Sequence, residues 1–168
     1  QGFHTWMLGL ASQWMNLSGL HANSVAPILV SREQGRRKST FCRSLMPDVL
    51  MRYYTDNLKL TSQGQAERLL AEMGLLNMDE FDKYAETKMP LLKNLMQMST
   101  LNIRKAYQQS FRQLPRVASF IGTSNRFDLL TDPTGSRRFL CVEVKHNIDC
   151  THIEHDQIFA QLKAELSA

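Results

Sequence analysis

The sequence has few cysteines and no long apolar run. Its three cysteines, Cys42, Cys141 and Cys150, form no Cys-x-x-Cys pair, so neither a disulfide framework nor a zinc site is indicated. We therefore expect a reducing, cytoplasmic location. The longest near-apolar stretch falls far short of the roughly 20 residues that a membrane-spanning helix needs. The chain also starts without the basic and apolar segments of a secretion signal, so we expect a soluble protein without a membrane partner.

A strong excess of charge of either sign is also missing. The formal net charge is +4 and the sequence pI is about 9.1, which mildly favours a polyanionic partner. The alternative is a solvated basic surface. With 168 residues, of which 43% are hydrophobic, the chain is long enough to bury one core. We expect a single domain over residues 1–168, and the abrupt start inside a helix-like pattern predicts a fragment of a longer protein.

Glycine is scarce in the stretch around which the chain is organised, residues 27–45. A short apolar run there breaks into a polar turn, and Lys38 opens an amphipathic segment. This is the outline of a phosphate-binding loop, G-x-x-x-x-G-K-[ST], in which backbone N–H groups and a helix N-terminus surround the phosphates. Arg32 and Arg37 stand where the pattern has glycine, and only Gly35 remains in the turn. The alternative is an ordinary strand, basic turn and helix.

Apolar runs and helical patterns alternate along the rest of the chain. The runs typical of strands are 27–31, 52–55, 74–81, 117–123 and 139–144. The segments with helical spacing are 3–20, 38–48, 85–98 and 153–166, and a further helix begins after Thr61 or Ser62. This alternation predicts an α/β fold with a central, largely parallel five-stranded sheet flanked by helices.

Polar side chains follow two of the predicted strands. Asp79 and Glu80 end the third strand, and Asn125 follows the fourth. In a parallel sheet the carboxyl ends of the strands face one crevice, which would also receive the loop before Lys38. We expect one carboxylate to hold hydrated Mg²⁺ and the other to orient and deprotonate a water. Asn125 would bind that water or the terminal phosphate. The alternatives are a solvated strand end and an Asn that caps a turn.

A basic and aromatic stretch occupies residues 99–115 without clean helical periodicity. Such a mixture suits a hairpin or loop that contacts a nucleic-acid backbone or base. The candidate contact residues are Arg104, Lys105, Tyr107 and Arg112. The alternative is an exposed basic hairpin without a ligand.

Two adjacent arginines, Arg137 and Arg138, follow a turn and directly precede the fifth predicted strand. They therefore belong to the amino end of that strand, away from the crevice of their own subunit. From there an arginine would reach a neighbouring subunit. The alternative is a pairing with a surface carboxylate beside the turn.

Four motifs occur in one specific order. They are Lys38-Ser39 after Gln34-Gly35, Asp79-Glu80, the GTSN of residues 122–125 and the TGSRRF of residues 134–139. On these motifs, residues 6–144 resemble the virulence-associated protein E family, whose ATPase core is similar to superfamily III helicases and to poxvirus-type primase-helicases. The resemblance implies a three-layer P-loop NTPase fold of the AAA+-like type, with ATP and Mg²⁺ as ligands.

The resemblance also implies roles for single residues. Lys38 would bind the β- and γ-phosphates, and Ser39 and Asp79 would hold Mg²⁺. Glu80 would act on the attacking water, and Asn125 would be the sensor. The loop residues implied in nucleotide contact are Gln34, Gly35, Arg36, Arg37, Lys38, Ser39 and Thr40. Arg137 or Arg138 would be an arginine finger that acts on a neighbouring subunit.

The departure from the family is the loop itself, because Arg32 and Arg37 put side chains where glycine lets backbone approach phosphate. In one interpretation Arg36 or Arg37 adds charge to the phosphate site, and the chain is the ATPase motor core of a DNA replication protein from a mobile element. That core would bind single-stranded or forked DNA and assemble into a homo-oligomeric ring. In the other, the site is blocked and the chain is a non-catalytic nucleic-acid-binding or assembly module.

Overall fold

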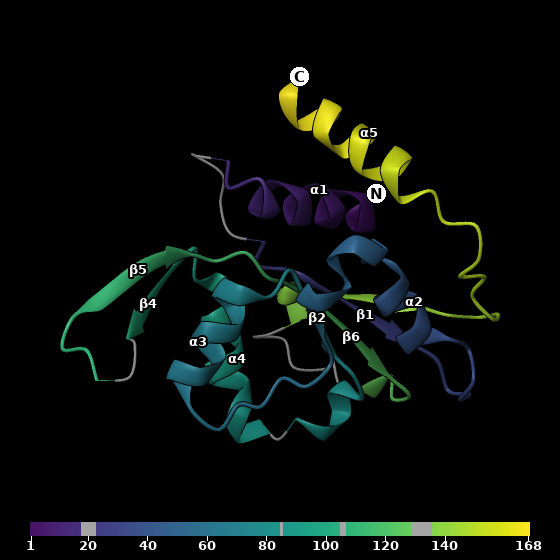
Figure 1. Cartoon of the computed structure of the whole chain (residues 1–168). Coiled ribbons are helices and arrows are strands. Elements are labelled where there is room, and N and C mark those ends of the chain that lie inside the picture. The colour runs from purple at the N-terminus through teal and green to yellow at the C-terminus, as the bar shows by residue number, and fades with distance from the viewer. Residues whose placement is uncertain (18–22, 85, 105–106, 129–135) are drawn as a thin grey trace.

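In the computed structural model, the described residues are 1–17, 23–84, 86–104, 107–128 and 136–168. A five-stranded sheet with the order β2-β3-β6-β1-β7 forms the centre of the molecule (Figure 1). Its strands are β1 (Ala26–Val30), β2 (Tyr54–Thr55), β3 (Leu75–Met78), β6 (Ser119–Ser124) and β7 (Phe139–Glu143). Each neighbouring pair is parallel. The predicted α/β fold with a parallel five-stranded sheet is therefore confirmed.

Side chains alternate between the two faces of the sheet, as the pleat of a strand requires. Ile28 and Val30 of β1 belong to the core that includes helices α3 and α4, whereas Leu29 belongs to the core with α1, α2 and α5. Phe120 and Ile121 of β6 divide in the same way. Because both faces are covered, the strands are apolar throughout rather than alternating in sequence.

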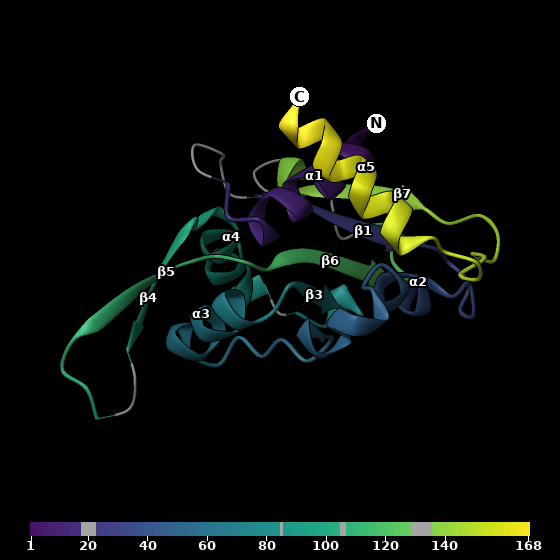
Figure 2. The ribbon, with the colours of Figure 1, turned by 45° about the horizontal axis from the view of Figure 1, so that its top comes forward.

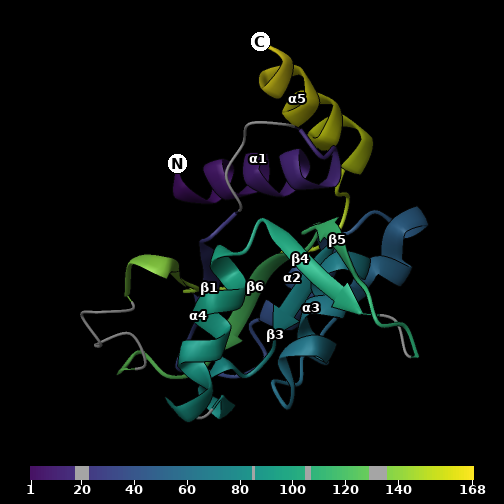
Figure 3. The ribbon, with the colours of Figure 1, turned by 90° about the vertical axis from the view of Figure 1, so that its left-hand side faces the viewer.

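The helices form the two outer layers. They are α1 (Gly2–Trp14), α2 (Lys38–Ser44), α3 (Gln63–Glu72), α4 (Met89–Gln97) and α5 (His155–Ser167). The 3₁₀ segments are η1 (Asp48–Tyr53), η2 (Phe81–Lys83), η3 (Glu86–Lys88) and η5 (Ser136–Arg138). Helix α5 lies outside α1 (Figure 3), and the Trp14 and Phe159 rings stack at 5.2 Å between centroids. No helix among the described residues is long and apolar enough to cross a membrane.

Several elements are shorter than the sequence predicts. The helix expected over 3–20 ends at Trp14, and the strand expected over 74–81 spans Leu75–Met78. The strand expected at 52–55 is only Tyr54–Thr55, since η1 occupies the residues before it and this edge strand pairs with β3 alone. The helix expected over 38–48 ends at Ser44. Pro47 explains that end, because proline disfavours helical backbone at the preceding residue.

A separate two-stranded hairpin lies between β3 and β6 in the chain. Strands β4 (Thr100–Arg104) and β5 (Phe111–Pro115) pair antiparallel. Leu101 is fully buried in the core with α3 and α4, while the other end of the hairpin extends beyond the body of the molecule (Figure 2). Of the hairpin or loop predicted for residues 99–115, the structure has the hairpin.

Arg116, which follows the hairpin, is a buried cation that joins three parts of the chain. Its guanidinium donates to the carbonyl oxygens of Leu95, Met96 and Met98 at the end of α4, at 2.5–3.2 Å. It also donates to the Asn23 carbonyl oxygen at 2.5 Å. The carbonyls at a helix C-terminus carry partial negative charge, which favours a cation there. Burial lowers the pKa of Arg116 to about 10.

The segment after β7 holds both ends of α2. The Ile148 N–H donates to the Arg36 carbonyl oxygen at 3.2 Å, just before α2 begins. At the other end, His155 Nε2 lies 2.6 Å from the Ser44 carbonyl oxygen. The loop before α2 is thus supported by residues more than 100 positions away in sequence.

Candidate functional site

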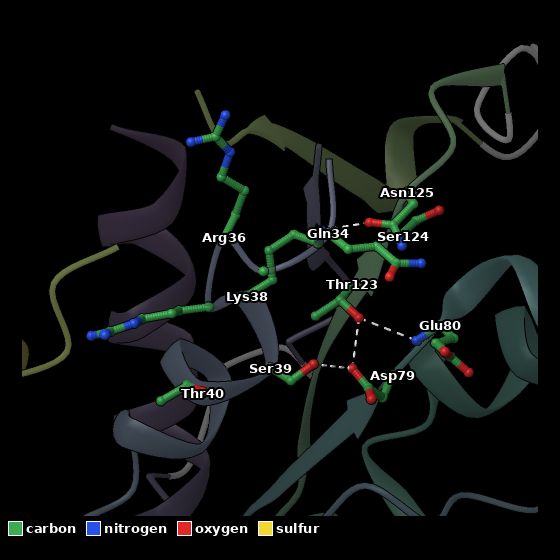
Figure 4. A pocket seen from close by; sticks show the side chains of 12 residues that line it. Gln34, Arg36, Lys38, Ser39, Thr40, Asp79, Glu80, Thr123, Ser124 and Asn125 are labelled. Atoms are coloured by element: carbon green, nitrogen blue, oxygen red, sulfur yellow. Dashed lines mark hydrogen bonds between the residues drawn. The ribbon is translucent and has the colours of Figure 1, made fainter. Parts of the chain in front are cut away.

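A cavity of about 310 Å³ lies at the carboxyl ends of β1, β3 and β6 (Figure 4). Because β6 lies between β1 and β3, the loop after β1, the carboxylates after β3 and the amide after β6 meet at one edge of the sheet. The cavity is lined by Gln34, Gly35, Arg36, Arg37, Lys38, Ser39, Thr40, Asp79, Glu80, Thr123, Ser124 and Asn125. The crevice expected from the sequence is therefore present.

Lys38 is the buried cation of this cavity, with 9% of its surface exposed. Its ammonium donates to Ser31 Oγ at 2.6 Å and to Asn125 Oδ1 at 2.7 Å. Burial lowers its pKa, and the negative charge of Asp79 partly opposes that effect. A partly desolvated lysine whose acceptors are neutral is placed to bind an anion. No carboxylate of the described residues neutralises its charge by a hydrogen bond, and an anion can replace the neutral acceptors of its N–H groups.

The loop before Lys38, residues 32–37, has a left-handed backbone at two residues, Gly35 and Arg37. Arg37, at the position of the second glycine of the pattern, has φ 62° and ψ 31°, in the left-handed region. Gly35 has φ 79°, and no atom lies within 4 Å of where its Cβ would be. A left-handed conformation strains an L-residue such as arginine. The loop therefore has the backbone turn that glycine favours, at a cost that glycine would avoid.

A hydroxyl and carboxylate network connects α2, β3 and β6. Ser39 Oγ donates to Asp79 Oδ1 at 2.5 Å, and Thr123 Oγ1 donates to the same oxygen at 2.7 Å. The Glu80 N–H in turn donates to Thr123 Oγ1 at 3.1 Å. These side chains converge in Figure 4. The two residues expected to share a metal ion, Ser39 and Asp79, are thus in direct contact.

Glu80 differs from Asp79 in its surroundings. Its backbone is left-handed, with φ 53° and ψ 56°, and its side chain is 55% exposed. Its carboxylate pairs with Lys83 rather than with a group of the phosphate loop. Glu80 lines the cavity. The Asp79 carboxylate is therefore held by hydrogen bonds, whereas the adjacent Glu80 carboxylate is exposed. Strained non-glycine backbone of this kind often occurs at functional sites.

The two loop arginines are directed toward other parts of the protein. Arg36 pairs with Glu33 and donates to Asn147 Oδ1 at 3.4 Å, and in Figure 4 its side chain extends away from Lys38 and Asn125. The pKa of Asp149 is lowered by hydrogen bonds from Thr151 and, to a smaller extent, by the charge of Arg37. Among the described residues, neither arginine forms a hydrogen bond or ion pair with Lys38 or Asp79. Gln34 and Thr40 are exposed and line the cavity.

Arg137 and Arg138 lie at the opposite edge of the sheet. They end η5, and Phe139 at the start of β7 pairs with Ala26, the first residue of β1. The cavity is at the other end of these strands, about 16 Å away for a five-residue strand. Arg137 is exposed and Arg138 half-buried. The structure therefore separates both arginines from the cavity of their own subunit, as expected from the strand direction.

The other predicted residues lie on the hairpin. Tyr107 is fully exposed with φ 67°, and Arg112 is exposed. The Arg104 guanidinium lies over the Phe111 ring, 5.9 Å from its centroid, and donates to the Gln108 carbonyl oxygen at 2.7 Å. Lys105 lies outside the described residues. The hairpin thus presents aromatic and cationic groups together on a projecting element, remote from the cavity.

Sequence reasoning missed three polar residues at the cavity. Ser31 accepts from Lys38, Thr123 bridges Asp79 and Glu80, and Ser124 Oγ donates to Asp82 Oδ1 at 3.2 Å. The available signal for Ser31 and Thr123 was their place at the carboxyl ends of two predicted strands. A hydroxyl there faces the same crevice as the residues that were identified.

The oxygen atoms of the cavity suit Mg²⁺, which binds few protein ligands, better than a metal ion that is coordinated entirely by protein side chains. Among the described residues no group of three or more His, Cys, Asp or Glu side chains is arranged to hold a metal ion. Mg²⁺ is ordinarily bound through one or two protein oxygens, with water and substrate phosphates completing its shell. The adjacent Ser39 and Asp79 oxygens supply that number.

Comparisons with known proteins identify a family and a fold. The model of the virulence-associated protein E-like domain matches residues 2–168. No curated protein matches the chain. Apo structures of the C-terminal region of NrS-1 are similar to it: one with a TM-score of 0.59 at 18% identity covers 97% of this chain and 39% of its own, and another with a TM-score of 0.55 at 19% identity covers 96% and 38%. The chain thus spans less than two-fifths of those neighbours, and at such identity the likeness concerns the fold alone.

Proposed function

Because this chain belongs to the family of virulence-associated protein E-like domains, we propose that it is the ATP-binding and ATP-hydrolysing motor core of a DNA replication protein from a mobile genetic element. Family membership confirms the resemblance that the four motifs indicated. The observation that carries the proposal is the convergence of Lys38, Ser39, Asp79 and Asn125 on one cavity. These groups come from three strand ends, and a structural role for any one of them would not require the others.

The chemistry of the cavity supports a nucleoside triphosphate as substrate. Lys38 is a buried cation whose present partners are neutral oxygens, so a phosphate oxygen would replace them with a charge-assisted hydrogen bond. Ser39 and Asp79 would hold Mg²⁺, which supplies neutralisation of charge on the phosphates. Glu80 would accept a proton from the attacking water, and Asn125 would orient that water or the terminal phosphate.

Glu80 has to change partner for this role. Its carboxylate pairs with Lys83 and is more than half exposed, and solvent screens an exposed ion pair of this kind, so that the pair contributes little. Breaking it therefore adds little to the barrier of a reaction. Its backbone is fixed by the bond from its N–H to Thr123, which keeps the side chain at the cavity while leaving it able to rotate.

The hairpin supports DNA as the partner of the motor. Tyr107 and the Arg104–Phe111 pair offer stacking surfaces, and Arg112 adds exposed positive charge. Base stacking on aromatic side chains and charge attraction to the backbone are the usual means of binding single strands without sequence preference. Because Leu101 anchors the hairpin in the core with α3 and α4, the position of the hairpin follows that of the motor core.

The separation of Arg137 and Arg138 from their own cavity supports assembly into a ring. An arginine finger stabilises charge that develops on the transferred phosphoryl group and typically changes the rate by about 10³–10⁵. Since both arginines lie at the far edge of the sheet, they would serve the cavity of a neighbouring subunit.

A second candidate function follows from the phosphate loop. Arginine replaces both glycines of the pattern, and Arg37 adopts a strained backbone. If that loop excludes nucleotide, the chain is a DNA-binding or assembly module whose activity resides in the hairpin.

ATP hydrolysis measured with and without single-stranded DNA separates the two functions. The motor predicts Mg²⁺-dependent hydrolysis that rises when DNA is added and disappears in Lys38→Ala. The control is Val49→Ala, which removes a side chain that lies in η1, is 86% exposed and does not line the cavity. Absence of hydrolysis and of ATP binding in the unaltered chain, together with retained DNA binding, would favour the module.

A further inference from the structure

A second cavity of about 440 Å³ adjoins the phosphate loop on the side of β7. It is lined by Ser31, Arg32, Glu33, Arg36, Phe127, Glu143, Val144 and Lys145. Arg36 lines both cavities, and Ser31 accepts the hydrogen bond from Lys38. The two cavities therefore share residues of the loop before Lys38.

One wall of this second cavity is a flat aromatic and cationic pair. The Arg32 guanidinium lies over the Phe127 ring, 5.5 Å from its centroid, and the ring is 40% exposed. Planar groups of both kinds stack on nucleobases, because every base has an aromatic face. Arg32 is also the residue that replaces the first glycine of the phosphate-loop pattern. Its substitution thus adds a stacking surface next to the phosphate loop.

The same cavity is also lined by polar groups that suit the edge of a base. Glu143, at the carboxyl end of β7, and Lys145 lie there and offer an acceptor and a donor. Glu33 is already paired with Arg36, whereas Glu143 forms no ion pair with any of the described residues. A free carboxylate favours a base with an exocyclic amino group, since it accepts from N–H and repels a carbonyl oxygen.

We propose that the second cavity binds the nucleobase of the triphosphate, stacked on Arg32 and Phe127 with its exocyclic amino group on Glu143. This inference rests on the proposed function. It concerns the base of the nucleotide, whereas the family motifs concern the phosphates, the metal ion and the attacking water. The phosphates then lie in the first cavity, and the nucleoside reaches the second around the loop that both cavities share.

Binding of ATP and of inorganic tripolyphosphate to the whole chain, measured by calorimetry, tests the stacking wall. Tripolyphosphate has the phosphates without the base. Phe127→Leu keeps apolar volume and removes the aromatic face, so it should weaken ATP binding about tenfold, or about 1.4 kcal/mol, and leave tripolyphosphate binding unchanged. The matched control is Met15→Ala, which removes a side chain of similar exposure, 39%, at the end of α1.

ATP and inosine triphosphate test the polar lining, because the base of inosine triphosphate has a carbonyl oxygen in place of the exocyclic amino group of adenine and an N–H in place of the N1 acceptor. The unaltered chain should prefer ATP, and Glu143→Ala should reduce that preference to near unity by weakening ATP and strengthening inosine triphosphate. A carboxylate that does not face the base would leave the ratio unchanged.

The outcomes separate this inference from the function on which it rests. If the unaltered chain binds neither ATP nor tripolyphosphate, the proposed function fails and the inference fails with it. If it binds ATP but Phe127→Leu and Glu143→Ala keep its affinity and base preference, the inference alone is overturned. Equal losses of ATP and tripolyphosphate affinity in Phe127→Leu would also overturn it, since the loss would then concern the phosphate loop.

Discussion

The left-handed backbone of Arg37 makes a quantitative prediction about stability. A non-glycine residue in this region costs about 1–2 kcal/mol, which Arg37→Gly would relieve. Glycine also loses about 0.5–1 kcal/mol more backbone entropy than alanine on folding. We therefore expect Arg37→Gly to be more stable than Arg37→Ala by about 0.5–1 kcal/mol. Both variants remove the same side chain, so the influence of Arg37 on Asp149 cancels in the comparison.

The assay is urea unfolding, with the midpoints compared at a common m-value. The matched control is the same pair of substitutions at Arg36, whose φ is negative, where glycine should be less stable than alanine by about 0.5–1 kcal/mol. The two glycine–alanine differences should thus have opposite signs. If glycine destabilises equally at both positions, the strain assigned to Arg37 is absent. Arg37→Gly should also bind ATP at least as tightly as the unaltered chain, and weaker binding would mean that the Arg37 guanidinium contacts phosphate.

Four further predictions concern the site and the core. Glu80→Gln should abolish hydrolysis in a phosphate-release assay and keep ATP binding, since an amide cannot accept the proton; full activity would remove Glu80 from the mechanism. Mixtures of Lys38→Ala with Arg137→Ala or Arg138→Ala should regain partial ATPase activity, because mixed interfaces pair an intact loop with an intact finger; no recovery despite confirmed co-assembly would refute an arginine finger in trans. Arg116→Met should lower the free energy of unfolding by about 3 kcal/mol, because it leaves buried carbonyls without a donor, and a loss below about 1 kcal/mol in urea unfolding would contradict that role. Burial raises the pKa of both Tyr54 and Tyr84 to about 12. Their contribution to the free energy of unfolding is therefore complete below the unfolded pKa near 10 and is lost as pH rises toward 12. Absorbance titration should show two of the four tyrosines ionising late, and a single transition near pH 10 in the folded protein would contradict this.

The five strands were predictable because both faces of the sheet are covered, which makes each strand a short apolar run. The convergence of Lys38, Asp79 and Asn125 followed from the direction of parallel strands. The roles assigned to these residues remain predictions that hydrolysis assays would test.

Other features depend on contacts that a local pattern does not contain. Arg36 contacts the distant Asn147 as well as Glu33. The small hydroxyls Ser31 and Thr123 resemble any strand end until Lys38 and Asp79 lie beside them. Arg116 was not predictable as a core residue, because arginine is almost always exposed unless it is paired. Its partners are carbonyl oxygens, which every sequence has and no sequence pattern reveals.

The residues after β7 contact both ends of α2, and these contacts connect the phosphate loop to α5. Ile148 and His155 contact the two ends of α2, and Phe159 of α5 stacks on α1. A coupling between two sites is reciprocal, so we expect a ligand that tightens the loop through these contacts to stabilise the docked α5 by the same free energy. Amide hydrogen exchange in α5 would then slow when the distant cavity is filled. The last helix of the chain thereby becomes a readout of occupancy at a site that it does not touch.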